Sequence, residues 1–224
     1  MARAFTAMVL DLDGTLIDSA PELARAANGA LAALGRRALA EAEVRAMIGD
    51  GIEALCRRSL AATGGVPPAD GFARALSDLR RHYAAEPPSA LYPGVRETLA
   101  RLKGDGLALG VCTNKPTDDA RRLIAALGLG DLVGAVAGGD SFAVRKPDPG
   151  HVAGLLARLG HGPKGAVMVG DGENDARAAR AAGIPFIAVA YGYAPGPVSA
   201  LGADAVIARF ADIPEALVAL AGRV

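Results

Sequence analysis

The sequence predicts an α/β protein: a doubly wound, mostly parallel sheet with a Rossmann-like core and an inserted helical cap. From about residue 90 onward, short apolar runs alternate with helical patterns, which is typical of βαβ units around a parallel sheet. A further apolar run, 8–10, lies near the N-terminus, and a block of helical stripes separates it from the rest. The 224 residues suffice for one large domain or for a core with a modest insertion.

The expected strands and helices of the core follow one another in a regular order. The apolar runs expected to form strands are 8–10, 107–112, 132–137, 166–169, 184–190 and 205–208. The helical patterns that follow them cover about 118–127, 149–159, 174–182 and 214–220. Since helices of this length separate successive strands, we expect βαβ units around a parallel sheet.

The segment between the first strand and the remainder of the sheet has a helical pattern. Apolar side chains at helical spacing form four stripes: Leu23 to Leu34, Val44 to Ile48, Ile52 to Leu60, and Phe72 to Tyr83. Gly- and Pro-rich segments at 64–68 and 86–88 are expected to form loops between or after these helices. We therefore expect a helical cap at residues 17–87, inserted into a catalytic core of residues 1–16 and 88–224.

Composition and charge exclude several classes of protein. The 24 basic and 24 acidic side chains cancel, and aromatic residues reach only 4%, so neither nucleic acid nor an anionic membrane is an expected partner. Asp11 and Asp13 interrupt the first apolar run too early for a signal peptide, and the uncharged stretch 181–203 carries three prolines. Cys56 and Cys112 suggest neither a disulfide framework nor a zinc site. We expect a cytoplasmic monomer or homodimer.

In a doubly wound sheet, ligands bind at the carboxyl ends of the strands. Polar residues follow four of the predicted strands at these ends. They are Asp11-Leu-Asp-Gly-Thr15, Thr113-Asn114, Lys146-Pro147 and Asp171-Gly-Glu-Asn-Asp175. Neighbouring carboxylates repel one another unless a cation holds them, and this set of hard oxygens suits Mg²⁺. An anion held between Mg²⁺ and Lys146, beside a carboxylate, is arranged for phosphoryl transfer to that carboxylate.

The four segments, in this order, resemble the four motifs of the haloacid dehalogenase superfamily. The resemblance covers essentially the whole chain and includes a helical cap after the first motif. Within the superfamily, local sequence resembles the phosphoglycolate phosphatases. That similarity rests on residues 11–21, 113–116, 138–140, 146–149 and 191–193. The chain departs from this subfamily at Gly172, where relatives often carry Ser; the change removes a hydroxyl near the metal.

The resemblance implies a role for each motif residue. Asp11 would be the nucleophile that forms an aspartyl-phosphate, and Asp13 would be the general acid and then the general base. Mg²⁺ would be held by Asp11, the backbone carbonyl of Asp13, and Asp171. Asp175 would support the metal without binding it directly, or through a water molecule. The phosphoryl oxygens would be bound by Thr113, the Asn114 backbone and Lys146.

Other polar residues have competing interpretations. Asp18 is expected either to cap a helix or to act at a cap hinge, and Asp175 either to cap a helix or to support the metal. Arg45, near the turn 49–51, is expected either to reach the leaving group or to be a solvated helix residue. Lys115 is expected to be solvated. The histidines at 82, 151 and 161 are expected at the surface.

The resemblance implies a Mg²⁺-dependent phosphomonoester hydrolase that acts on a small phosphorylated metabolite, with 2-phosphoglycolate as the first expected substrate. The alternatives are a phosphatase, pyrophosphatase or phosphomutase acting on another small phosphate compound. A phospho-acceptor signalling module is a remoter alternative, since such modules also combine an acidic Mg²⁺ pocket with a Thr and a Lys-Pro. A cap that closes over substrate favours an enzyme.

Overall fold

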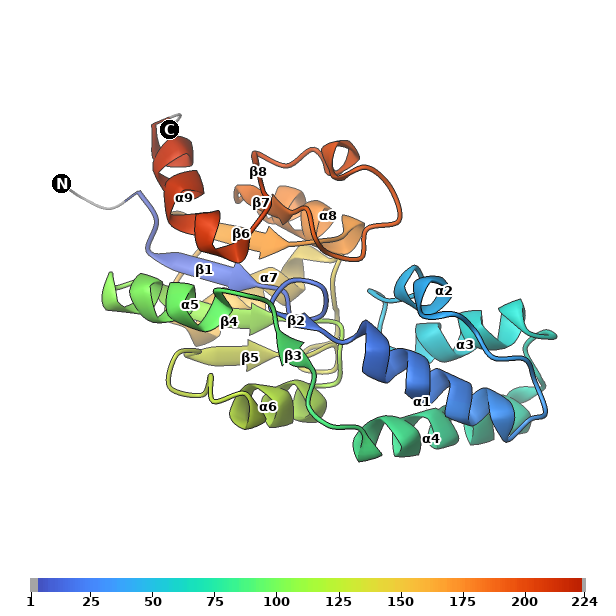
Figure 1. Ribbon diagram of the computed structural model, residues 1–224. Helices are drawn as coiled ribbons and strands as arrows, with labels where there is room; N and C mark the ends of the chain where they lie inside the picture. Colours follow the sequence, from blue (N-terminus) through green and yellow to red (C-terminus); the bar gives the residue numbers. More distant parts are fainter. Residues whose placement is uncertain (1–3, 223–224) are drawn as a thin grey trace.

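The computed structural model describes residues 4–222 and contains a six-stranded sheet beside a group of helices (Figure 1). The sheet has the order β5-β4-β1-β6-β7-β8, and every neighbouring pair is parallel. Its strands are β1 (Ala7–Leu10), β4 (Ala108–Cys112), β5 (Ala135–Ala137), β6 (Ala166–Gly170), β7 (Phe186–Val189) and β8 (Ala205–Ile207). The predicted doubly wound α/β fold is confirmed.

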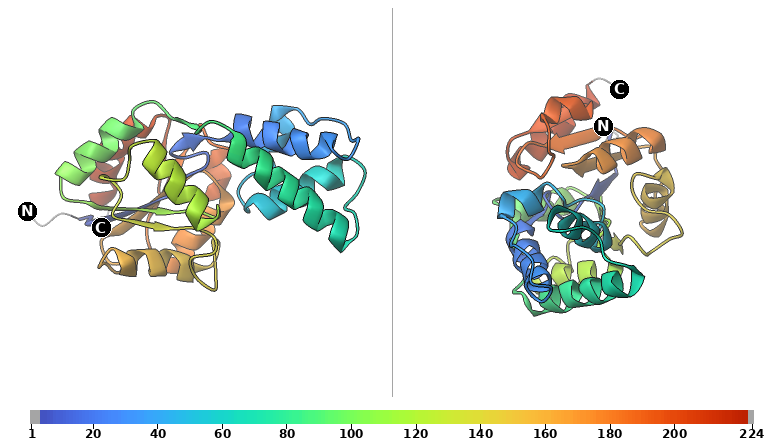
Figure 2. Two further views of the ribbon diagram at one scale, coloured as in Figure 1. Left: turned by 90° about the horizontal axis from the view of Figure 1, so that it is seen from below. Right: turned by 90° about the vertical axis from the view of Figure 1, so that its right-hand side faces the viewer.

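Helices cover both faces of the sheet, as the left view of Figure 2 shows. One face packs against α5 (Val95–Gly104), α6 (Thr117–Ala126) and α9 (Ile213–Ala221), and the other against α7 (Pro149–Arg158) and α8 (Glu173–Ala182). Side chains alternate along β1 accordingly: Met8 and Leu10 belong to the first core, and Ala7 and Val9 to the second. Because both faces are buried, the central strands are apolar throughout.

Four helices form a separate bundle with its own hydrophobic core. They are α1 (Ala20–Ala32), α2 (Glu41–Arg45), α3 (Ile52–Ala62) and α4 (Ala69–Ala85). A short antiparallel pair, β2 (Ile17–Asp18) and β3 (Ala90–Leu91), carries the chain out to this bundle and back. Both connections lie on the same side of the sheet, which places the bundle beyond the carboxyl ends of the strands (Figure 1).

Several observed elements differ from expectation, and the short strands β2 and β3 are among those that were not predicted. Helix α5 was not among the predicted helices, although Val95, Leu99 and Leu102 lie on one buried face. Strand β5 begins at Ala135, because Leu132 instead forms a turn in which its N–H donates to the Leu129 carbonyl. Two 3₁₀ segments, η1 (Val198–Leu201) and η2 (Phe210–Asp212), also lacked a predicted counterpart.

Two sequence-based exclusions can be compared with the structure. Cys56 and Cys112 are both buried and unbonded, as small apolar residues would be. Among residues 4–222, the structure contains no helix with the length and hydrophobicity that crossing a bilayer requires.

Candidate active site

The predicted site residues converge where the sheet order reverses. From β1 the chain builds the sheet outward through β4 and β5 on one side and through β6, β7 and β8 on the other. The loops after β1, β4 and β6 therefore meet in one crevice, which is where open α/β sheets bind ligands. These loops carry Asp11, Thr113 and Asp171.

Asp11 and Asp175 share a buried lysine. The Lys146 ammonium nitrogen lies 2.8 Å from Asp11 Oδ1 and 2.6 Å from Asp175 Oδ1. Burial would lower the pKa of Lys146, but the two carboxylates outweigh burial and raise this pKa above its usual range. The ammonium therefore stays charged. The second Asp175 oxygen accepts from the N–H groups of Asp171 and Gly172, at the start of α8. Asp175 thus caps the start of α8, as one of the two expectations held, and its other oxygen faces the acidic site; its support of a metal stays a prediction.

Asp171 is fixed on the other side of Asp11 by the chain around it. Its Oδ2 accepts from the Tyr193 N–H at 2.6 Å, and its Oδ1 accepts from the Thr15 hydroxyl at 3.3 Å. Gly14, with φ of +80°, lets the first loop approach, because a Cβ there would overlap the Asp171 carboxylate. This close approach explains a glycine in the first motif.

The residues present fit a divalent cation. One carboxylate oxygen from each of Asp11, Asp171 and Asp175 lies within 4.8 Å of the others. Burial, followed by the charge of Asp175, raises the pKa of both Asp11 and Asp171. A cation bound among these oxygens would relieve that repulsion. Both oxygens of Asp175 accept from Lys146 and from backbone N–H groups, and both oxygens of Asp171 accept from Thr15 and Tyr193.

Asp13 points away from this cluster, toward the helical bundle. Its Oδ1 accepts from the Ser19 hydroxyl at 2.5 Å and lies 3.1 Å from the ammonium of Lys115. Ser19 directly precedes α1 and makes no side-chain cap for it, because the hydroxyl is engaged with Asp13. The residue directly before the first bundle helix therefore contacts the residue predicted as general acid.

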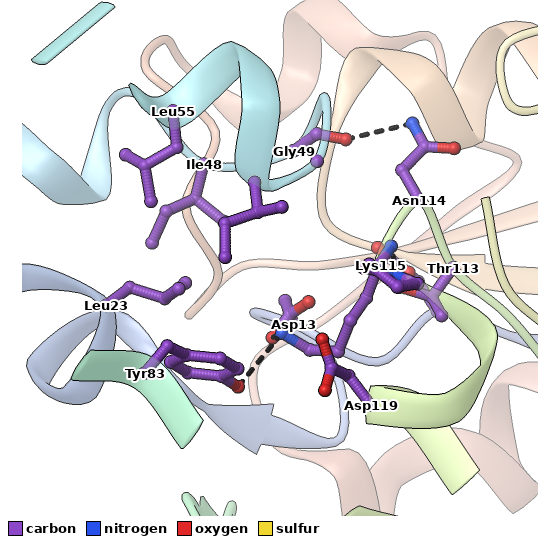
Figure 3. Close-up of a pocket in the computed structure, with 14 residues that line it drawn as sticks. Asp13, Leu23, Ile48, Gly49, Leu55, Tyr83, Thr113, Asn114, Lys115 and Asp119 are labelled. Atoms are coloured by element: carbon purple, nitrogen blue, oxygen red, sulfur yellow. Dashed lines mark hydrogen bonds and ion pairs between the residues drawn. The ribbon is translucent and has the colours of Figure 1, made fainter. Parts of the chain in front are cut away.

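Two cavities meet at Asp11 and Asp13. One has a volume of about 430 Å³ and is also lined by Lys146, Asp171 and Asp175. The other, shown in Figure 3, has a volume of about 40 Å³ and lies between the β4 loop and the helical bundle. Its bundle side has four apolar side chains, Leu23, Ile48, Ile52 and Leu55, together with Tyr83 and two glycines of the loop at 48–51. Phosphate and metal chemistry fit the first cavity, and a small leaving group fits the second.

The β4 loop joins the core to the bundle. Thr113 is buried and lines the small cavity beside Asp11. The Asn114 side-chain amide donates to the carbonyl of Gly49 in the bundle at 3.0 Å (Figure 3). It also donates to the carbonyl of Lys146 at 3.0 Å. Asn174 adds a second contact to the same bundle loop, donating to Asp50 Oδ1 at 2.7 Å. The bundle loop at 48–51 is thus held against the core.

The expectation that Lys115 is solvated was wrong. Its side chain is 6% exposed and lies between Asp13 and the Tyr83 hydroxyl, to which it donates at 3.1 Å. The sequence held a signal: lysine occurs only four times among 24 basic residues, and this one directly follows Thr113-Asn114 at a strand end. A lysine buried without a partner would be costly, so the carboxylate nearby accounts for its placement.

The surface placement expected for the histidines was wrong for His151. The ring is fully buried; its Nδ1 accepts from the Lys146 N–H at 3.1 Å, and its Nε2 donates to the Gly138 carbonyl at 3.0 Å. Burial, and then the Lys146 ammonium, lower the pKa of His151 to about 4. The neutral ring therefore holds the backbone of the Lys146-Pro147 loop, whose peptide bond is cis.

Arg45 lies on α2 with a partly exposed side chain, in ion pairs that neither of its two expectations included. It does not line the small cavity; its guanidinium pairs with Asp18 at 3.2 Å and with Glu41 at 3.3 Å, and lies over the Tyr193 ring. Asp18 likewise does not cap a helix, since the Tyr193 hydroxyl donates to it at 2.8 Å. These three residues form a contact between the bundle and the β7 side of the core.

Tyr193 is the functional neighbour that sequence reasoning passed over. Its N–H binds Asp171, while its hydroxyl accepts from the N–H groups of Ser19 and Ala20 at 2.6 and 3.1 Å. Tyr191 nearby donates to the Thr15 carbonyl at 2.9 Å. The segment at 191–193 supported only a resemblance in the sequence, because the pairing of residues so far apart is invisible there.

Comparisons with known proteins agree with this geometry. A family model described as haloacid dehalogenase-like hydrolase matches residues 5–183. A phosphoglycolate phosphatase of Rhodospirillum rubrum is 43% identical over 213 residues, covering 92% of this chain and 88% of the relative. A phosphoglycolate phosphatase of Yersinia pseudotuberculosis is 41% identical over 218 residues, covering 96% and 94%.

Among solved structures, a crystal structure described as a predicted phosphoglycolate phosphatase from Haemophilus somnus superposes with a TM-score of 0.92 at 33% identity. The match covers 96% of this chain and 99% of that one. Fold, site geometry and sequence similarity along most of the chain thus lead to one assignment. This chain belongs to the haloacid dehalogenase-like hydrolase family.

Proposed function

We propose that this protein is a Mg²⁺-dependent phosphomonoesterase that converts 2-phosphoglycolate to glycolate and phosphate through a phosphorylated Asp11. The observation that carries the proposal is the arrangement around Asp11. Lys146 lies on one side of it, two further buried carboxylates lie within metal-binding reach, and Asp13 faces the small cavity. This arrangement supplies a nucleophile, charge neutralisation and a proton donor in one crevice.

In the first step, a carboxylate oxygen of Asp11 attacks phosphorus as the bond from phosphorus to the ester oxygen breaks. Asp13 gives its proton to the leaving alkoxide, which departs as an alcohol. Thr113, the Asn114 N–H and Lys146 bind the phosphoryl oxygens. Lys146 holds Asp11 at 2.8 Å, which keeps the nucleophile oriented.

In the second step, the Asp13 carboxylate takes a proton from a water molecule, whose oxygen attacks the phosphorus of the aspartyl-phosphate. The bond between phosphorus and the Asp11 oxygen breaks, which releases phosphate and restores both aspartates. The contact of Asp13 with Ser19 supports a placement at the small cavity, on the leaving-group side. One residue thus acts as acid and then as base.

Mg²⁺ would be held by Asp11, the Asp13 carbonyl and Asp171, with Asp175 as an outer partner. Bound there, the ion supplies positive charge that offsets the repulsion between the phosphoryl group and Asp11. The raised pKa values of Asp11 and Asp171 support a cation at this position.

Cavity size and similarity support 2-phosphoglycolate as the substrate. Relatives covering nearly the whole chain carry the name phosphoglycolate phosphatase. The small cavity of about 40 Å³ holds about three water-sized groups, which suits the two-carbon glycolate better than a sugar. A larger leaving group would require the bundle loop at 48–51 to move off the core.

The test is phosphate release from a panel of 2-phosphoglycolate, pyrophosphate, several sugar phosphates and p-nitrophenyl phosphate, with and without Mg²⁺. We expect kcat/KM for 2-phosphoglycolate to exceed the others by at least about tenfold, which is about 1.4 kcal/mol of transition-state preference. Asp11→Asn should abolish turnover, and acid quenching of the wild type should trap one phosphoryl group on Asp11.

Other results would change the assignment. Preference for a different ester would keep the chemistry and discard the substrate. A phosphoenzyme that persists for many minutes, without turnover of any ester, would instead favour a phospho-acceptor signalling module.

A further inference from the structure

Lys115 stands out in the small cavity because it is the positively charged side chain among the described residues that line it. It contacts neither Asp11 nor the acidic metal cluster. Its ammonium nitrogen lies 3.1 Å from Asp13 Oδ1 and 3.1 Å from the Tyr83 hydroxyl oxygen. Tyr83 lies on α4 of the bundle, so the pair joins core and bundle across the cavity (Figure 3).

This pair has hydrogen-bond capacity left over. An ammonium has three N–H donors, and Asp13 and Tyr83 accept from two of them. The Tyr83 hydroxyl accepts from Lys115, and within residues 4–222 it donates to no acceptor. One ammonium proton and one phenol proton therefore remain for a ligand in the cavity that both residues line.

Within the described part of the chain, three carboxylates and one ammonium line the small cavity, so an anionic leaving group would depend on Lys115 for a positive partner. Lys146 is already shared between Asp11 and Asp175, whereas Lys115 has one carboxylate partner. The Asp13 carboxylate and the Tyr83 hydroxyl, each 3.1 Å from the Lys115 nitrogen, offset the cost of burying the ammonium. Asp119, the remaining acidic residue of this wall, pairs with Arg122 at 2.9 Å, which reduces its repulsion of an anion.

We propose that Lys115 and Tyr83 form the subsite that recognises a carboxylate on the leaving group, and that they determine specificity for phosphate esters of short hydroxy acids. This inference rests on the proposed phosphatase function and names the chemistry of its substrate class. Asp13 must contact the ester oxygen to protonate it. In 2-phosphoglycolate one methylene separates that oxygen from the carboxylate, which then reaches the ammonium 3.1 Å from Asp13.

The competing explanation is that Lys115 only positions Asp13. That role would affect every substrate alike, because each ester needs the same proton. A carboxylate subsite would affect only substrates that carry the carboxylate. The two explanations therefore differ in the ratio of kcat/KM values for matched substrates with and without that group.

The experiment compares 2-phosphoglycolate with ethyl phosphate, which has the same two-carbon length and no carboxylate. For the wild type we expect kcat/KM to favour 2-phosphoglycolate strongly. In Lys115→Met the ratio of the two constants should fall at least about 20-fold, the loss expected for a hydrogen bond to a charged group. Tyr83→Phe, which removes only the hydroxyl, should lower the ratio about three- to tenfold. Lys164→Met, on an exposed loop, is the matched control and should leave the ratio unchanged.

A readout independent of turnover separates this proposal from the proposed function. In an Asp11→Asn background, calorimetry with Mg²⁺ present should show 2-phosphoglycolate binding at least about 20-fold more tightly than ethyl phosphate, and Lys115→Met should remove that difference. If the wild type hydrolyses no ester, the proposed function fails, and these binding constants still decide the subsite.

Three results would overturn the subsite. Equal losses for both substrates in Lys115→Met would assign the residue to positioning Asp13. A preference for 2-phosphoglycolate that survives Lys115→Met would place the carboxylate elsewhere. Equal binding of both ligands to the Asp11→Asn protein would show that no carboxylate is recognised.

Discussion

Substitution of His151 tests whether this buried histidine stabilises the fold, since an exposed histidine would contribute little to the free energy of unfolding. In the substitution His151→Phe, a ring of similar size replaces the imidazole, so loss of packing is small and loss of hydrogen bonds dominates. The Lys146 N–H loses its acceptor, while the Gly138 carbonyl keeps the Ser141 N–H at 3.0 Å. The variant therefore leaves the buried Lys146 N–H without an acceptor and also loses the hydrogen bond to the Gly138 carbonyl.

The magnitude follows from these two contacts. A stranded buried donor costs about 1–3 kcal/mol and a lost hydrogen bond about 0.5–1.5 kcal/mol. We expect the free energy of unfolding at pH 7.5 to fall by about 2–4 kcal/mol, or roughly 4–16 °C in Tm for a chain of this size. The measurement is urea unfolding followed by circular dichroism.

The pH dependence provides a sharper test. The pKa of His151 is lowered from 6.5 to about 4 in the folded protein, so between these values the unfolded chain binds the proton and the folded chain does not. The neutral His151 ring therefore makes its full contribution to the free energy of unfolding above pH 6.5. This contribution is lost as the pH falls toward 4. At pH 5.5 the free energy of unfolding of the wild type should be about 1.3 kcal/mol lower than at pH 7.5 because of this group. His151→Phe lacks the group, so the difference in free energy of unfolding between the two proteins should narrow.

The control and the contrary result are both specific. His161→Phe, in the loop between α7 and β6, should change the free energy of unfolding by less than about 0.5 kcal/mol. A gap for His151→Phe that stays the same, or widens, at pH 5.5 would refute the argument. It would mean that the folded protein accommodates the imidazolium, and thus that burial does not control this histidine.

Further predictions concern single side chains. Gly172→Ser should change Tm by less than about 2 °C, because φ is −124° and the added Cβ meets its nearest neighbour at 3.8 Å; a larger loss in differential scanning calorimetry would contradict this. Asn174→Ala removes a bundle contact and should lower kcat/KM about three- to tenfold with Tm unchanged; an unaltered kcat/KM would show that this contact does not aid closure. Asp171→Asn should weaken Mg²⁺ binding by calorimetry beyond the roughly 10–100-fold that loss of an outer-shell partner costs, and equal affinity would remove Asp171 from the metal site. Arg45→Ala should reduce stability by about 1 kcal/mol or less and change kcat/KM for 2-phosphoglycolate less than about threefold; a large rise in KM would return Arg45 to the leaving-group site.

The sequence predicted the sheet well because its strands are buried on both faces. Such strands are continuous apolar runs, and a polar residue directly after one marks its carboxyl end. Asp11, Thr113 and Asp171 were found this way, and each lies in the crevice between β4, β1 and β6. The long run at 184–190 marked β7 correctly, although the strand itself covers only 186–189.

What the sequence did not predict depends on contacts between distant residues. Lys115 and Arg45 look alike in the sequence as isolated cations near turns. Lys115 is buried because a carboxylate 102 positions earlier lies 3.1 Å away, whereas Arg45 is drawn to Asp18 at the edge of the bundle. Neither partner follows from periodicity or spacing, so Lys115 was wrongly expected to be solvated, and the alternatives for Arg45 did not include its ion pair with Asp18.

The contacts of Lys115 also bear on how leaving-group recognition and closure of the bundle are related. Lys115 belongs to the core and Tyr83 to α4, so the pair of donors exists only while the bundle lies against the core. A carboxylate that accepts from both would bind the closed arrangement more tightly than an open one, and a ligand shifts such an equilibrium only through this difference in affinity. Ethyl phosphate lacks the group that contacts Tyr83. A leaving group with a carboxylate would therefore favour closure over Asp13, the residue that must protonate it.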